Sequence, residues 1–153
     1  MTEQLITSRD NGRLMAARRV RDGRDKFRIF IEGSRLAEEA VRSDLKITEC
    51  FLSDGFDAPE LVRSITAPTF RMPEKVFKTL ADTESPQGII LVAERPTMRP
   101  FIKTLLPITV FLNEINNPSN LGAILRTAEA AGVGHVVLSK GSTDPYEIGR
   151  AHV

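Results

Sequence analysis

A strand–turn–helix pattern near the C-terminal end restricts the fold more than any other feature of the chain. Ile108–Leu112 is apolar and rich in β-branched and aromatic side chains, which predicts a buried strand. A turn at residues 118–119 then leads to a helix over 121–131, with Asn120 as its N-cap. The apolar side chains of this helix recur at helical spacing: Leu121, Ile124, Leu125 and Ala128. A strand that leads through a polar turn into a helix predicts an α/β fold.

Arg126 lies on this predicted helix but away from its apolar stripe. At about 100° per residue it lies about 140° from Leu121, so its guanidinium is expected to point toward whatever binds at the turn. Gly122 lies one turn before Arg126, and a residue without a side chain lets a ligand or a second backbone approach closely. Asn120 and Arg126 are therefore candidates for a site. A capping asparagine and a solvated arginine are also common in ordinary strand–helix units.

The rest of the chain alternates between predicted helices and strands. Helices are expected over 14–21, 35–41, 59–65 and 73–80, and strands over 27–31, 47–52, 69–71, 88–92 and 135–138. This alternation predicts a small α/β domain over residues 1–95, with helices layered on a sheet. Two prolines at its end favour a linker over 96–106, and a second α/β unit covers 107–146. One βαβ arrangement is expected to leave sheet edges and the apolar stripe of its helix uncovered.

Composition excludes several classes of protein. No apolar run approaches the roughly 18 residues of a membrane-spanning helix. Met1–Ser8 lacks the apolar core of a secretory signal, so a cytoplasmic protein is expected. Cys50 is the only cysteine and is expected to pack in a strand, while His135 and His152 are the only histidines. Neither an intramolecular disulfide nor a metal site is therefore expected.

A run of arginines near the N-terminal end indicates a polyanionic partner. Between Arg9 and Arg28 the chain carries eight basic and three acidic residues, a local excess of +5 in a protein whose net charge is +1. The planar fork of arginine suits phosphate contacts better than the point charge of lysine. A solvated helix face is the alternative explanation, but the density of arginines favours RNA or another polyanion.

Four segments, in the same order along the chain, resemble the SpoU (TrmH-like) family of RNA ribose methyltransferases. Asn120–Ala128 resembles the first signature motif of the family, in which an asparagine, a glycine and an arginine follow a strand. Ile6–Asn11 resembles its opening segment, and Phe30–Ala40 resembles a segment with Glu-Gly followed by Glu-Ala. Ser85–Gly88 resembles the Pro-Gln-Gly that enters the last strand of the first domain.

The resemblance implies a fold and an activity. The first domain would be an RNA substrate-binding domain with a ribosomal-protein-like fold, and the second would be the first part of a methyltransferase domain with an α/β (SPOUT) knot. The implied reaction transfers a methyl group from S-adenosylmethionine to a ribose 2′-oxygen of structured rRNA or tRNA. The family also implies a homodimer formed through the knotted domain.

The same resemblance assigns catalysis to Arg126, with Asn120 in the same site. A guanidinium is effectively always protonated, so Arg126 is expected to bind the neighbouring phosphate and stabilise the developing alkoxide. Action of Arg126 as a general base is the alternative. Glu114 could assist as a hydrogen-bond acceptor, or could be a solvated loop carboxylate.

The RNA-binding candidates fall into two groups. Phosphate contacts are expected from residues of the arginine run and its first turn: Arg9, Asn11, Arg18, Arg19 and Arg24. Residues at strand ends are expected to meet a bulged or looped base: Glu32, Gly33, Gln87 and Gly88. The two glycines could instead serve only to permit tight turns.

The chain also departs from the family. A glycine-rich loop and a Leu-Pro-Met/Ser-Leu-Asn segment, which build the knot and the cofactor pocket, are absent, so cofactor-binding residues are not assigned. Residues 147–153 do not resemble the family's continuation and are expected to be a non-matching tail. The chain is therefore expected to be an inactive fragment. A non-catalytic RNA-binding module is the main alternative, and a Rossmann-like nucleotide-binding domain is disfavoured because no Gly-x-Gly-x-x-Gly loop follows Leu112.

Overall fold

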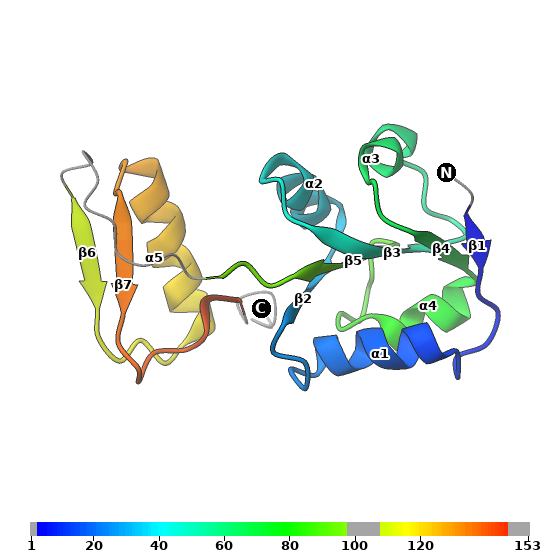
Figure 1. The fold of residues 1–153 in the computed structure, drawn as a ribbon, viewed down its shortest axis with the longest axis horizontal. Coiled ribbons are helices and arrows are strands. Elements are labelled where there is room, and N and C mark those ends of the chain that lie inside the picture. Colours follow the sequence, from blue (N-terminus) through cyan, green and yellow to red (C-terminus); the bar gives the residue numbers. More distant parts are fainter. Residues whose placement is uncertain (1–2, 98–107, 147–153) are drawn as a thin grey trace. The chain divides into compact units, whose positions relative to one another are not determined.

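The computed structural model of the chain describes residues 3–97 and 108–146 (Figure 1). The chain divides into two compact units, Met1–Pro96 and Thr97–Val153. We call these the first and the second unit and describe each by itself.

A mixed five-stranded sheet runs through the first unit. Its strands are β1 (Gln4–Leu5), β2 (Arg28–Glu32), β3 (Ile47–Ser53), β4 (Thr69–Met72) and β5 (Ile89–Glu94), in the spatial order β1-β4-β3-β5-β2. Strand β4 is parallel to both β1 and β3, whereas β5 is antiparallel to both β3 and β2. Strand β5 therefore lies inside the sheet although it is the last of these strands in the chain.

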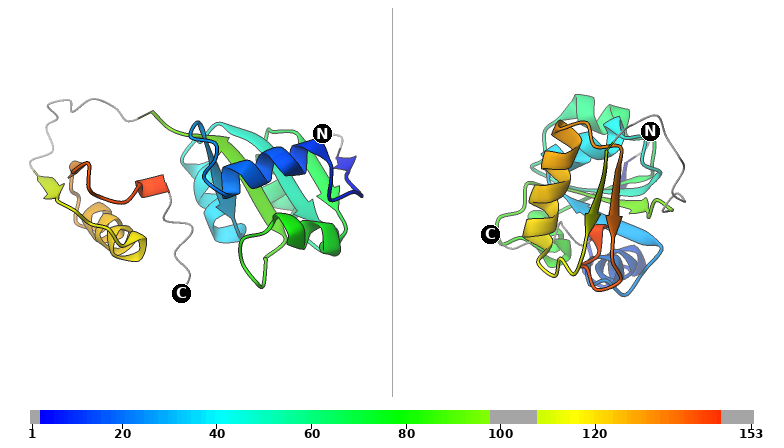
Figure 2. Two further views of the ribbon diagram at one scale, coloured as in Figure 1. Left: turned by 90° about the horizontal axis from the view of Figure 1, so that it is seen from below. Right: turned by 90° about the vertical axis from the view of Figure 1, so that its left-hand side faces the viewer.

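Helices cover both faces of this sheet and make three layers. Helices α1 (Gly12–Arg21) and α4 (Glu74–Leu80) lie on one face, and α2 (Ser34–Arg42) and α3 (Pro59–Ser64) lie on the other (Figures 1 and 2). Each face has its own hydrophobic core, one with Leu14 and Phe77 and the other with Ala37 and Ile65. The predicted fold class, a small layered α/β domain, is confirmed.

The two cores explain why every residue of β5 from Ile89 to Ala93 is apolar. Ile90 and Val92 belong to the core under α1 and α4, while Ile89, Leu91 and Ala93 belong to the core under α2 and α3. A strand that is buried on both faces has no polar side to alternate with. Cys50 lies fully buried in the neighbouring strand β3, as expected.

Helix α1 begins after a capping asparagine and ends just before a glycine. The Asn11 side chain accepts a hydrogen bond from the Arg13 amide at 2.9 Å and so caps the helix. Such a cap contributes about 1 kcal/mol to stability. Gly23, just after the helix, has a φ of +70°, a conformation that glycine adopts without steric cost.

The second unit is one βαβ arrangement, as predicted, but its helix starts earlier than expected. Strands β6 (Thr109–Leu112) and β7 (His135–Leu138) pair in parallel and are connected through α5 (Pro118–Ala130). Asn117, and not Asn120, is the N-cap, because the Asn117 side chain accepts a hydrogen bond from the Asn120 amide at 3.1 Å. Pro118 then occupies the first helical turn, where its missing N–H is not needed.

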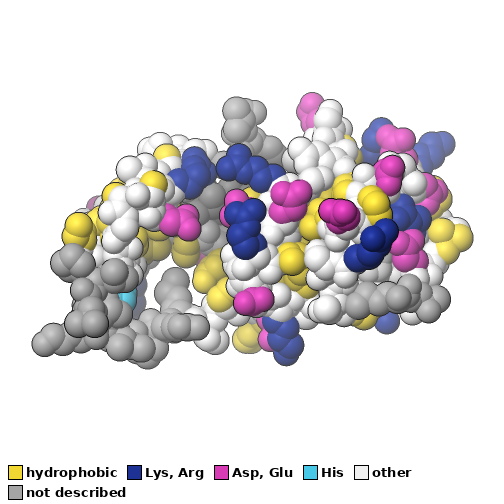
Figure 3. Space-filling model, turned by 90° about the horizontal axis from the view of Figure 1, so that it is seen from above, with side chains coloured by type: hydrophobic (Ala, Val, Ile, Leu, Met, Phe, Trp, Pro, Cys, Tyr) yellow, Lys and Arg dark blue, Asp and Glu magenta, His cyan; other side chains and the backbone are white. Residues whose placement is uncertain are grey.

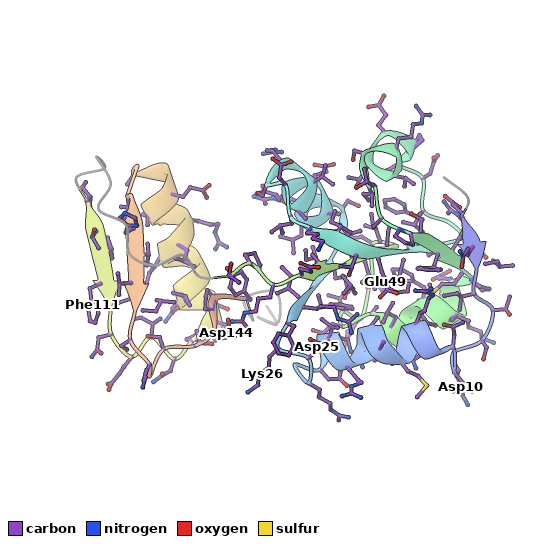
Figure 4. The ribbon with its side chains drawn as sticks, viewed as in Figure 1. Asp10, Asp25, Lys26, Glu49, Phe111 and Asp144 are labelled. Carbon is purple, nitrogen blue, oxygen red and sulfur yellow. The ribbon has the colours of Figure 1, made fainter. Side chains whose placement is uncertain are left out.

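Burial in the second unit also differs from the prediction. The strand predicted over Ile108–Leu112 was expected to be buried, yet Phe111 is 64 % exposed and lies on the side of β6 away from α5 (Figure 4). The helix stripe was expected to be uncovered, yet Leu121 is fully buried and Ala128 is 7 % exposed. The reason is that a single helix covers one face of the two-stranded sheet. The helix stripe packs on that face, and among the described residues no element packs on the other face.

Within the described residues, no helix has the length and apolar character needed to cross a membrane.

Candidate functional site

Some arginines of the run between Arg9 and Arg28 make hydrogen bonds within the first unit, and others do not. Arg18 donates hydrogen bonds from Nε to the Thr79 carbonyl at 3.1 Å and from Nη2 to the Thr79 hydroxyl at 2.5 Å. Arg21 donates from Nη1 to three carbonyls, those of Thr79, Leu80 and Ala81, at 3.2, 3.0 and 3.1 Å. The last carbonyls of a helix lack partners within the helix and carry partial negative charge. These two guanidinium groups therefore connect α1 to the C-terminal end of α4.

Arg9, Arg19, Arg24 and Lys26 have no such partners. All four are exposed and make no ion pair or side-chain hydrogen bond with another residue in the described part of the chain. Arg9 also lines an open hollow of about 570 Å³ together with Lys75. Within the described residues, the unpartnered cations of the run thus lie on α1 and on the loops at its two ends.

The predicted phosphate contacts are consequently not equivalent. Arg9, Arg19 and Arg24 have guanidinium groups without a partner among residues 3–97 and 108–146, whereas the Arg18 guanidinium is held against Thr79. The Asn11 side-chain oxygen is used in capping α1. Sequence gives no signal for this division, because the partners of Arg18 lie 61 residues away.

The second predicted group, at the strand ends, comes together in space. Glu32 ends β2 and Ile89 begins β5, and these strands are neighbours. Glu32 accepts hydrogen bonds from the Asp82 amide, at 2.8 Å, and from the Thr83 hydroxyl. Gln87 accepts one from the Ser34 amide at 2.9 Å, at the first turn of α2. Both side chains therefore fasten the loop that precedes β5 to the end of β2.

Gly33 and Gly88 have conformations that side chains rarely adopt. Their φ angles are +99° and +86°. A Cβ at Gly88 would lie 2.6 Å from the Ser53 Oγ, and a Cβ at Gly33 would lie 3.0 Å from the Gln87 Oε1. The structure thus gives both glycines a role in the turns, one of the two roles considered from the sequence.

A hollow of about 280 Å³ opens at this junction and is lined by Glu32, Gly33, Arg35, Leu36, Thr83, Ser85 and Gln87. Arg35, Thr83 and Ser85 were not identified from the sequence. Over the face that carries α2 and α3, acidic and basic side chains are interspersed (Figure 3). The unpartnered cations of the run lie on and around α1, which covers the opposite face of the sheet (Figure 1).

In the second unit, Arg126 and Asn120 both lie exposed on α5. They are six positions apart, which corresponds to about 9 Å along a helix axis and about 120° around it. Within the described residues their side chains do not contact each other. Gly122 is buried within this helix.

The loops at the carboxyl ends of β6 and β7 are joined by hydrogen bonds. The Glu114 amide donates to the Ser139 hydroxyl at 2.9 Å, the Ile115 amide donates to the Ser142 hydroxyl at 3.2 Å, and the Thr143 amide donates to the Ile115 carbonyl at 2.8 Å. Ligands of open α/β sheets bind outside this end of the strands. Here these amides and hydroxyls bond to one another, so these particular groups are not free to act as donors to a ligand.

Comparison with known families agrees with this division into two units. Residues 12–91 match the MRM3-like substrate binding domain, and residues 107–152 match the SpoU rRNA Methylase family. The chain belongs to the SpoU rRNA methylase family and carries an MRM3-like substrate-binding domain. The family predicted from the four sequence segments is therefore confirmed. The expected non-matching tail at 147–153 lies outside the described residues and stays a prediction, although the family match extends to residue 152.

Three relatives show how far the similarity reaches. The chain is 32% identical over 118 residues to 23S rRNA (guanosine(2553)-2′-O)-methyltransferase RlmP of Bacillus subtilis, covering 76% of this chain and 46% of the relative. It is 29% identical to the mitochondrial rRNA methyltransferase 3 of Xenopus tropicalis, covering 78% of this chain and 31% of the relative. A solved AdoMet-bound rRNA methyltransferase from Sinorhizobium meliloti superposes with a TM-score of 0.79 at 25% identity, over 96% of this chain and 58% of that one. The chain thus spans less than half the length of these two curated relatives.

Proposed function

We propose that the chain serves in 2′-O-methylation of a ribose in rRNA, with the first unit holding the RNA and the second unit supplying Arg126. One observation carries the proposal: in a domain of the substrate-binding type, Arg9, Arg19 and Arg24 are exposed and unpartnered within the described residues, while their neighbours in the run are bonded. Charges that are not used by the fold remain available to a polyanion. Ribosomal RNA is favoured over tRNA because the relatives named above are rRNA methyltransferases.

The proposed contacts of the first unit are to phosphates. Three guanidinium groups on and around one helix can follow the backbone of a structured RNA without reading its bases. Each such contact releases counterions, so the affinity should fall steeply as the salt concentration rises. The junction of Glu32, Gly33, Gln87 and Gly88 is a second proposed contact, in which a looped base meets the hollow beside it.

Arg126 is proposed to bind the phosphate next to the target ribose. Its guanidinium is exposed and makes no ion pair with another described residue, and a planar fork can bind two phosphate oxygens at once. The same charge would stabilise the 2′-oxygen as its proton leaves. General-base action by Arg126 is the less favoured alternative because the guanidinium is protonated at neutral pH. Asn120 is proposed to contact the RNA from the first turn of α5.

S-adenosylmethionine would supply the methyl group, and one of the solved relatives is described as bound to it. A homodimer and a cytoplasmic location also remain predictions, because nothing in the structure tests either of them.

Binding of RNA can be tested with two matched double variants. Arg19→Ala/Arg24→Ala removes two unpartnered cations beside α1, and Arg42→Ala/Arg63→Ala removes two exposed cations from the opposite face of the sheet. Titration of an rRNA transcript at several salt concentrations should show weaker binding for the first variant and a salt slope lower by about 1 per lost phosphate contact. The second variant should bind like the unaltered chain. Equal effects of the two variants would show that only net charge matters and would remove α1 from the interface.

A non-catalytic RNA-binding module is the second candidate function. It is favoured by the loops after β6 and β7, whose amides and hydroxyls are bonded to each other. Incubation of the chain with S-adenosylmethionine carrying a labelled methyl group and with an rRNA transcript separates the two candidates. Label in the RNA that disappears with Arg126→Ala supports the enzyme. RNA binding without any label in the RNA supports the module.

A further inference from the structure

We propose that the first unit holds an unpaired nucleotide of RNA in a cavity between the start of α1 and the end of β5, with the base stacked on Phe27 and a phosphate on Arg13 and Arg28. The cavity measures about 620 Å³ and is lined by Arg13, Phe27, Arg28, Thr48, Glu49, Glu94 and Arg95. The proposal deepens the RNA-binding function proposed above and rests on it. None of these residues was among the contacts expected from the sequence.

Phe27 has an exposed side chain and a hydrogen-bonded backbone. Its side chain is 85 % exposed, although phenylalanine is normally among the more buried residue types. The Phe27 amide donates to the Asp25 carboxylate at 2.9 Å, and the Phe27 carbonyl accepts from the Arg95 amide at 2.7 Å. Figure 4 shows Asp25 and Lys26 at the turn that leads into β2. These two hydrogen bonds anchor the backbone of Phe27, and its exposed ring offers a face on which a base can stack.

A single buried carboxylate orients the two arginines of the cavity. Glu49 is 9 % exposed, and its Oε1 accepts a hydrogen bond from Arg13 Nη1 at 3.0 Å. Its Oε2 is buried, accepts no hydrogen bond from the residues that the structure describes, and lies 3.8 Å from Arg28 Nη1. Figure 4 places Glu49 on the side of the sheet that faces α1. Glu49 is therefore a positioning residue: its carboxylate interacts with both guanidinium groups and places them on the same side of the cavity.

Further contacts hold these arginines and leave part of each exposed. The Arg28 Nη2 pairs with Asp25 at 2.9 Å, and the Arg13 guanidinium lies over the Phe70 ring, 4.7 Å from its centroid. The Arg13 side chain nevertheless remains 53 % exposed, and the Arg28 side chain 29 %. Two guanidinium groups that are already oriented lose little freedom when they bind a phosphate.

The combination of groups selects a nucleotide that is not in a duplex. Ligand cavities usually measure about 300–1,000 Å³ and combine apolar surface with a few oriented polar groups. In an A-form helix the bases are stacked on each other and cannot also stack on a protein ring. A loop, bulge or single strand offers both a free base face for Phe27 and a phosphate for the arginines.

The test uses the full chain and the fact that it contains no tryptophan. In a Phe27→Trp variant, all tryptophan fluorescence reports on this one position. A short single-stranded oligoribonucleotide should quench the fluorescence saturably, because the indole ring stacks on a base. The same strand annealed to its complement should not. A Leu5→Trp variant is the control, since Leu5 is also exposed on the first unit, at 68 %, but lies on β1, away from the cavity lining and from α1.

Affinities provide the second measurement. Phe27→Ala should weaken binding of the single strand about 5- to 150-fold, since stacking of one base on an aromatic ring contributes about 1–3 kcal/mol. Phe27→Tyr, which keeps a flat ring, should restore binding, and binding of the duplex should not change in either variant. Because Phe27 is exposed, these substitutions should leave the fold intact, and circular dichroism checks this.

Two outcomes overturn the inference and differ from failure of the proposed function. If Phe27→Ala binds single strands as well as the unaltered chain, while Arg19→Ala/Arg24→Ala binds them weakly, the nucleotide site is wrong and RNA binding by the first unit stands. If the unaltered chain binds neither single strands nor rRNA, the proposed RNA binding fails and the nucleotide site fails with it.

Discussion

Arg21 donates a hydrogen bond from its guanidinium to the carbonyl oxygen of Leu80 at 3.0 Å, at the point where α4 ends. The carbonyl oxygens of Thr79 and Ala81 also accept hydrogen bonds from the same Nη1. Arg19 lies two residues away on the same helix but makes no side-chain hydrogen bond within the described residues. Two neighbouring arginines of one basic run therefore differ: Arg21 is bonded within the fold, and Arg19 is exposed on the surface. Their contributions to the free energy of unfolding should differ accordingly.

Arg21→Ala should lower the free energy of unfolding of the first unit by about 1.5–3 kcal/mol, because hydrogen bonds to a charged group are lost at half-buried carbonyls. Arg19→Ala should change it by no more than about 0.5 kcal/mol, as is usual for surface substitutions. Urea denaturation followed by circular dichroism measures both. Equal stability of the two variants would show that the contacts to α4 contribute nothing.

Gly88→Ala should destabilise the first unit by at least about 1–3 kcal/mol, the usual cost of a side chain in a positive-φ conformation. The new Cβ would also lie 2.6 Å from the Ser53 Oγ. Gly55→Ala is the matched control, because a Cβ there meets nothing within 4 Å. Thermal denaturation of the two variants gives the comparison, and a Gly88→Ala protein as stable as Gly55→Ala would contradict the described turn.

Cys50 should be unreactive in the folded protein. Burial raises the pKa of its thiol to about 12, so the reactive thiolate is scarce near neutral pH. Alkylation by iodoacetamide at about pH 8 should therefore require unfolding of the first unit and should accelerate in urea in step with the loss of helical signal. Rapid alkylation without denaturant would show that β3 is accessible in the native state.

The Asp25 carboxylate should make stability depend on pH at acid values. The Phe27 amide, which donates a hydrogen bond to it, and then Arg28 hold the pKa of Asp25 below its ordinary value of about 3.9. A depressed pKa gives a stabilisation that is fully present above the ordinary value and is lost as the pH falls through the lower, folded-state pKa.

The Asp25→Asn variant isolates this contribution from that of Glu3, whose pKa is also lowered, by its hydrogen bond to Arg71. The difference in unfolding free energy between the unaltered chain and Asp25→Asn should be constant near neutral pH and shrink below about pH 4. A difference that stays constant down to the acid limit would show that the turn before β2 does not depend on the charge of Asp25.

Local features of the fold could be predicted from sequence because they depend on neighbours in the chain. The Asn11 cap, the end of α1 near Gly23 and the strand–helix alternation all belong to this group. The cap of α5 was predicted at Asn120, but Asn117, which also has a capping side chain, is the N-cap. Pro118 decides between them, since proline fits the first turn of a helix but would be only a turn residue if the helix began later.

Contacts between distant residues account for what the sequence could not show. The hydrogen bond from Thr83 to Glu32 spans 51 residues, and that from Ser34 to Gln87 spans 53. Nothing local distinguishes a glutamate that fastens a loop from one that is free to contact RNA. The ion pairs of Glu49 with Arg13 and Arg28 were missed for the same reason, and with them the cavity beside Phe27.

The position of β5 has a consequence for synthesis of the protein. Strand β2 pairs only with β5 among the described strands, and β3 needs β5 to cover one of its edges. The chain leaves the ribosome from its N-terminal end, so β2 emerges about 60 residues before its partner. Until Ile89–Glu94 has emerged, the nascent chain carries unpaired strand edges that are prone to association. The sheet can therefore be completed only at the end of translation of this unit, when β5 inserts between β3 and β2.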